Sequence, residues 1–67
     1  MAYFIDLKNA NEKRWTFIDE VHKDLMEALN SATNIANSTK GPLKIRVWDE
    51  ENDKFVVIMD LMNRKED

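Results

Sequence analysis

The stretch that decides the fold is YFIDLKNANEKRWTF, residues 3–17, which can pair with itself as a β-hairpin. If the chain turns at residues 9–11, opposite charges meet on one face and large apolar side chains on the other: Lys8 with Glu12, Asp6 with Arg14, Ile5 with Trp15, and Tyr3 with Phe17. Cross-strand pairs of these kinds stabilise a two-stranded ribbon. Asn11 tolerates the left-handed conformation that ends a three-residue turn. The sequence therefore predicts strands at residues 2–8 and 13–18.

A helix competes with the second of these strands. Asn9 followed by Glu12 resembles a capping box, and Trp15 and Ile18 lie at a helical spacing that continues downstream. This alternative replaces the strand with a helix over residues 10–38 and gives the order βαββ. We favour the hairpin, because the Trp-Thr-Phe-Ile run is rich in strand formers and the charge pairs fit only that register.

The pattern from Asp19 to Ser38 predicts a helix under both interpretations. Its apolar residues recur every three or four positions and form one stripe: Val21, Leu25, Ala28, Leu29, Ala32, Ile35 and Ala36. Asp19 or Thr16 can cap the start of the helix. Gly41 and Pro42 end it, because glycine accepts the left-handed position past a helix and proline blocks continuation. The stripe contains three alanines, so the helix can lie close to the surface that it covers.

Residues 43–61 give the clearest strand pattern in the chain. LKIRVW (43–48) alternates apolar and polar residues, and KFVVIMDL (54–61) follows an acidic turn. A turn at residues 51–53 sets a register in which charge meets charge and apolar meets apolar: Glu50 with Lys54, Val47 with Val57, Ile45 with Met59, and Lys44 with Asp60. A slip by one residue would place charges on the apolar face. This segment therefore predicts a second hairpin.

These elements predict an α+β fold in the order ββαββ, with one helix packed on one face of a four-stranded sheet. The chain of 67 residues makes a single small domain, and its polar residues 63–67 are expected to be a frayed tail. No cysteine is present, which excludes disulfides and thiolate metal sites. No apolar run approaches the roughly 20 residues that span a bilayer, and no signal peptide is expected. We expect a cytoplasmic protein.

The second face of the predicted sheet has no cover. An open face in water is normally polar, but this one carries large side chains that include Phe4, Ile18, Trp48, Val56 and Ile58. Exposed apolar patches of this kind mark interaction surfaces, and a two-fold dimer is the commonest oligomer. We therefore predict an interface with a second copy or with another protein at five residues: Phe4, Trp48, Val56, Ile58 and Arg46.

Basic and aromatic residues on one strand suggest a second candidate function. Lys44, Arg46 and Trp48 alternate along residues 43–48, and Arg14 lies nearby in the predicted sheet. Such a surface can bind single-stranded nucleic acid by contacting phosphates and stacking on bases. The formal net charge of −3 argues against this, because phosphate binding depends on positive charge. A nucleic-acid-binding regulator is therefore the alternative to a protein-binding module.

No catalytic, cofactor-binding or metal site is predicted. His22, the only histidine, is expected to be exposed on the first turns of the helix without a nucleophile beside it. The acidic run DEEND, residues 49–53, lacks the glycine and the distal glutamate of an EF-hand loop. We therefore expect a small intracellular protein-binding module, an adaptor, inhibitor or regulator, and not an enzyme. Its Asn- and Lys-rich composition is typical of AT-rich coding sequence, as in many low-GC bacteria and their phages, so a phage or mobile-element origin is one interpretation.

Overall fold

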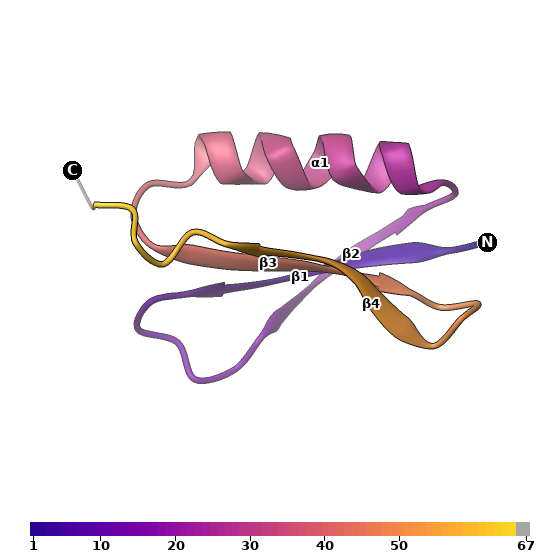
Figure 1. The fold of residues 1–67 in the computed structure, drawn as a ribbon, viewed down its shortest axis with the longest axis horizontal. Coiled ribbons are helices and arrows are strands. Elements are labelled where there is room, and N and C mark those ends of the chain that lie inside the picture. Colours follow the sequence, from indigo (N-terminus) through magenta and orange to yellow (C-terminus); the bar gives the residue numbers. More distant parts are fainter. Residues whose placement is uncertain (66–67) are drawn as a thin grey trace.

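A computed structural model describes residues 1–65 and shows four antiparallel strands and one helix, which confirms the predicted ββαββ class (Figure 1). The elements are β1 (Tyr3–Asn9), β2 (Thr16–His22), α1 (Leu25–Ser38), β3 (Leu43–Asp49) and β4 (Lys54–Asp60). The strands form one sheet in the spatial order β2-β1-β3-β4. The helix α1 runs along one face of this sheet and leaves the other face open (Figure 1). The alternative of one long helix over residues 10–38 is wrong.

The core lies between α1 and the two central strands. Three alanines of α1 face the sheet, and each is at most 8% exposed: Ala28, Ala32 and Ala36. The central strands contribute four large side chains that are fully buried: Ile5, Leu43, Ile45 and Val47. Because alanine has no side chain beyond Cβ, the helix lies close to the sheet. Leu25 and Leu29 of the predicted stripe are only half-buried, so the alanines form the centre of the helix interface.

The predicted register of the second hairpin is confirmed along most of its length. Lys44 pairs with Asp60, Ile45 with Met59, and Val47 with Val57. A bulge follows Val47, after which Trp48 pairs with Phe55 and Asp49 with Lys54. The predicted pair of Glu50 with Lys54 is therefore wrong.

The turn between β3 and β4 explains this bulge. The side chain of Asp49 accepts hydrogen bonds from the backbone nitrogen and the side-chain amide of Asn52, at 3.2 and 2.7 Å. Asp49 therefore closes the turn and takes the position opposite Lys54. As a result Phe55 joins Trp48 on the open face, and Val56 packs against the core.

The first hairpin forms, but its predicted register is wrong by three residues. Asp6 pairs with Phe17, and Ile5 pairs with Ile18. An odd shift exchanges the two faces of a strand, so Phe17 lies on the open face and Ile18 packs against the core. The charge pairs that favoured the predicted register were expected at the surface, where such pairs contribute only about 0.2–1 kcal/mol each. Ile18, which is partly buried, gains part of the about 1.5–3 kcal/mol that full burial of an isoleucine contributes.

The strand β2 continues farther than predicted, and the helix starts later. The N-cap is Asp24, whose side chain accepts a hydrogen bond from the backbone nitrogen of Glu27 at 2.8 Å. Asp19, the predicted cap, lies within β2. Val21 therefore leaves the helix stripe and is 60% exposed, whereas His22 is 7% exposed at the end of β2. The predictions of an exposed, helical His22 and of Val21 in the helix stripe are both wrong.

The chain that follows β4 returns to the end of α1. Arg64 donates hydrogen bonds to the backbone oxygens of Ala36 at 2.7 Å and Thr39 at 2.8 Å, and to that of Gly41 at 2.8 and 3.0 Å. The oxygens at the end of a helix have no partner within the helix itself, so Arg64 satisfies part of this end. Gly41 adopts the left-handed conformation, with φ of 84°, which a glycine accepts without strain. Residues 66–67, the end of the tail predicted to be frayed, lie outside the described residues.

Candidate functional site

The open sheet face is the side of the sheet turned away from α1. Large apolar side chains from all four strands gather on it: Phe4, Phe17, Trp48, Phe55 and Ile58. Ile58 is 67% exposed and Phe17 is 54% exposed, so they are among the most exposed apolar side chains of the protein. The same face also carries charged side chains, among them Asp6, Lys44, Arg46 and Asp60. Within residues 1–65, no helix lies over it.

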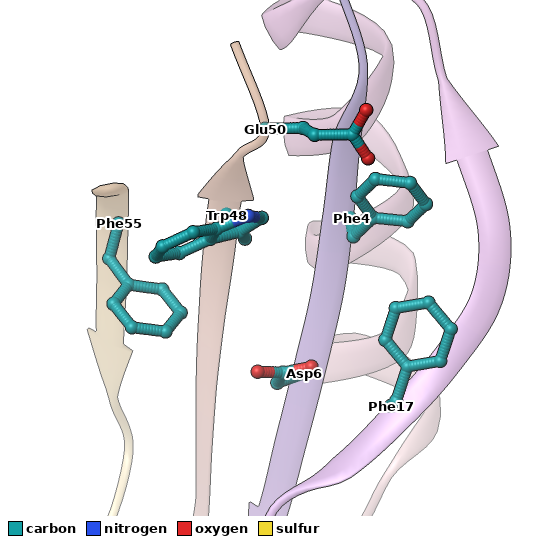
Figure 2. Close-up of a pocket in the computed structure, with 6 residues that line it drawn as sticks. All are labelled: Phe4, Asp6, Phe17, Trp48, Glu50 and Phe55. Carbon is teal, nitrogen blue, oxygen red and sulfur yellow. The ribbon is translucent and has the colours of Figure 1, made fainter. Parts of the chain in front are cut away.

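Four of these side chains form the walls of a groove. The rings of Phe4 and Phe17 are 5.5 Å apart and tilted by 39°, while those of Trp48 and Phe55 are 4.7 Å apart and meet edge to face. The groove has a volume of about 330 Å³, and Asp6 and Glu50 complete its lining. Figure 2 shows the two aromatic pairs on opposite sides of the groove, with a carboxylate toward each end. Aromatic pairs in these arrangements contribute about 0.5–1.5 kcal/mol beyond their burial, which holds the walls in place. We call this site, defined by these six residues, the aromatic groove.

Beside the groove, Arg46 is held by three side chains. Its Nε lies 3.0 Å from Oδ2 of Asp6. Its Cζ lies 4.0 Å from the ring centroid of Trp15 and 4.1 Å from that of Phe55. The side chains of Arg46 and Asp6 are only 25% and 17% exposed. Arg46 is therefore an ordered part of the open sheet face, and Asp6 pairs with it and not with Arg14 as predicted.

The structure brings together three of the four residues predicted for nucleic-acid contact. Lys44, Arg46 and Trp48 alternate along β3 on the open sheet face. Arg14 lies in the connection between β1 and β2, where it is exposed. Both basic residues of β3 lie beside a carboxylate, because Nζ of Lys44 is 3.9 Å from Oδ2 of Asp60.

Of the five residues predicted for a partner interface, four lie on the open sheet face: Phe4, Arg46, Trp48 and Ile58. Val56 does not, because the β-bulge turns it toward the core, so its predicted position on the open face is wrong. Three further residues lie on this face that the sequence did not predict there: Phe17, Phe55 and Trp15. The position of Phe17 depends on the shifted register of the first hairpin, and that of Phe55 depends on the bulge after Val47.

A second cluster of ionisable groups surrounds His22. Its Nδ1 lies 3.2 Å from Oε1 of Glu27, and its Nε2 lies 3.8 Å from Oε2 of Glu20. The buried Nε2 has no hydrogen-bond partner. No group of three or more metal-ligating side chains that could hold a metal ion occurs within residues 1–65. The cluster fixes the end of β2 against the start of α1, because Glu27 belongs to the first turn of the helix.

Asp49, the first residue of the acidic run, makes its hydrogen bonds within the turn. Asp49 is 3% exposed. The hydrogen bond from the side chain of Asn52 lowers the pKa of Asp49, and burial opposes this effect. This carboxylate therefore has a structural role in the turn.

Comparisons with known protein families, with curated proteins and with solved structures found no match for this chain. Across residues 1–65, no helix is long and apolar enough to cross a membrane. The open sheet face is thus the feature from which a function can be inferred.

Proposed function

We propose that the protein is a small protein-binding module that docks through its open sheet face. The observation that carries this proposal is the exposure of Phe17, in the aromatic groove, and of Ile58, on a face where a one-sided sheet is normally polar. Contiguous apolar patches with a charged rim mark sites of protein interaction. Lys44, beside Asp60, provides such a charge, whereas Arg46 pairs with Asp6 within the face. An adaptor, an inhibitor and a regulator would each use such a face.

The size of the face indicates the kind of complex. Four strands of seven residues cover roughly 23 by 19 Å, given the spacings of a β-sheet. A stable interface buries about 800 Å² on each partner, roughly twice this projected area. Docking on this face alone therefore supports a reversible complex better than a permanent one.

A second copy of the chain is one partner of this kind. A homodimer through the open sheet face would cover Ile58 and Phe17 on both copies. We expect such a dimer to be populated at high micromolar concentration. Sedimentation over rising concentration measures this, and a monomer at high micromolar concentration would leave another protein as the partner.

Nucleic-acid binding has weaker support. A phosphate contact by Arg46 would have to replace its ion pair with Asp6, and one by Lys44 would compete with Asp60. The formal net charge of −3 opposes binding further.

Matched charge substitutions test the proposal. Ile58→Lys places a charge on the open sheet face, and Met26→Lys places the same charge on α1, at positions that are 67% and 66% exposed. Because both positions are exposed, both variants should fold with nearly the melting temperature of the unmodified protein. Proteins captured from the native host by the unmodified chain should be retained by Met26→Lys and reduced about tenfold or more by Ile58→Lys. Equal capture by all three chains would contradict the proposal.

A further inference from the structure

The lining of the aromatic groove has a chemistry that selects its ligand. Four aromatic rings and two carboxylates line it, and none of the six lining residues is basic. The face of an aromatic ring carries partial negative charge and attracts cations. Asp6 is already paired with Arg46, so the rings and Glu50 are the groups that favour a positive charge in the groove.

One cationic side chain of the protein itself, Arg46, is held by this chemistry. The guanidinium of Arg46 stacks between Trp15 and Phe55 and pairs with Asp6. Two of these three partners, Phe55 and Asp6, also line the groove. The groove therefore repeats, on its other walls, the arrangement that holds Arg46, and it contains no basic side chain of its own.

Glu50 is the carboxylate best placed to meet a ligand. It is exposed, and it makes no ion pair within the part of the chain that the structure describes. Asp6, in contrast, binds Nε of Arg46 through Oδ2. Figure 2 shows the carboxylate of Glu50 beside Phe4, at the end of the groove opposite Asp6. A cation that enters the groove would meet Glu50 at this end.

We infer that the aromatic groove binds an arginine side chain of the partner protein. The volume of about 330 Å³ lies at the lower end of the range for ligand pockets, which suits one long side chain. Arginine fits better than lysine, because its planar guanidinium both stacks on rings and forks onto carboxylate oxygens. This inference rests on the proposed docking function and names the chemistry of its ligand.

Titration of the labelled full chain, followed by nuclear magnetic resonance, tests the inference. The probe is acetyl-Gly-Arg-Gly-amide, and the control is the same peptide with citrulline, which has the shape of arginine without its charge. The arginine peptide should shift the indole resonance of Trp48 and the amide resonances of Phe4 and Phe17 in a saturable manner. The citrulline peptide should bind about tenfold more weakly.

Variants of the groove give a second readout. Glu50→Gln should weaken arginine binding about threefold or more, because it removes the exposed carboxylate. Phe17→Leu should do the same by removing one ring of the wall. Glu51→Gln is the matched control, since Glu51 is exposed in the same turn outside the groove, and it should leave binding unchanged.

Three results would overturn the inference. These are no saturable shift with the arginine peptide, equal shifts with citrulline, or tighter binding of a lysine peptide or of tetramethylammonium at the same resonances. The docking function is tested separately by the capture experiment with Ile58→Lys. A failed arginine titration combined with loss of capture by Ile58→Lys would reject the arginine site and retain the docking face. Capture that is indifferent to Ile58→Lys would reject the docking function itself.

Discussion

At the scale of single residues, Arg46 is the side chain that organises the open sheet face. It joins β3 to β1 through Asp6, and it joins both strands to the rings of Trp15 and Phe55. The pair is only partly accessible to water, so removing one partner leaves the other charge poorly solvated. The side chains of Lys44 and Asp60 are 35% and 61% exposed, so water solvates either charge when the other is removed.

A double-mutant cycle measures this difference. We expect Asp6→Asn to reduce the free energy of unfolding by about 1–3 kcal/mol, and Asp6→Asn with Arg46→Met to recover part of that loss. The corresponding cycle on Lys44 and Asp60 should give a coupling below about 0.5 kcal/mol. Urea unfolding measures both, and equal coupling in the two cycles would disprove the organising role of Arg46.

Asp49 gives the protein a defined response to acid. Its pKa is lowered in the folded state, chiefly by the side chain of Asn52. A lowered folded-state pKa contributes stability that is complete above the unfolded-state value, about 4, and is lost as the pH falls through the folded-state value. Asn52→Ala should therefore reduce the loss of stability that protonation of Asp49 causes as the pH falls. Urea unfolding midpoints between pH 2 and pH 6 measure this effect. Midpoints of the variant and of the unmodified protein that fall in parallel would refute it.

At the scale of elements, the start of α1 is set by Asp24. The chain offers several cap residues, and the structure uses the one that allows β2 to continue to His22. Removal of a cap side chain costs about 0.5–2 kcal/mol.

Two single substitutions distinguish the observed cap from the predicted one. Asp24→Ala should lower the free energy of unfolding by about 1 kcal/mol, because the backbone nitrogen of Glu27 loses its acceptor. Asp19→Ala should change it by less than about 0.5 kcal/mol, because Asp19 is exposed in β2. Denaturant midpoints check both values, and the reverse order would mean that the helix begins at Asp19.

The elements also differ in how far the sequence predicts them. Most of the second hairpin was predictable, because a slip by one residue would place Lys44 and Arg46 on its apolar face. The first was not, because the sequence shows its surface charge pairs but does not show that Ile18 lies under the helix. The same limit applies to the candidate site. Phe4, Arg46, Trp48 and Ile58 were predicted for this face, whereas the positions of Phe17 and Phe55 depend on a shifted register and a bulge.

At the scale of the whole molecule, the open sheet face is better suited to a partner than either edge of the sheet. The edge strand β2 pairs irregularly with β1 and carries Asp19 and Glu20. The edge strand β4 contains the run FVVIM, but a bulge interrupts its pairing, and Lys54 and Asp60 flank the run. Bulges and charges on edge strands discourage pairing with another sheet. The apolar surface available for docking is therefore the open sheet face.

The most direct test of this claim is site-specific photocrosslinking in the native host. A benzophenone amino acid would replace Phe17 or Ile58 on the open sheet face, or Met26 on α1 as a control of similar exposure. We expect discrete crosslinked products, either of two copies or with another protein, from the first two positions and none from the third. Crosslinks from Met26 alone, or equal yields from all three positions, would contradict docking through the open sheet face.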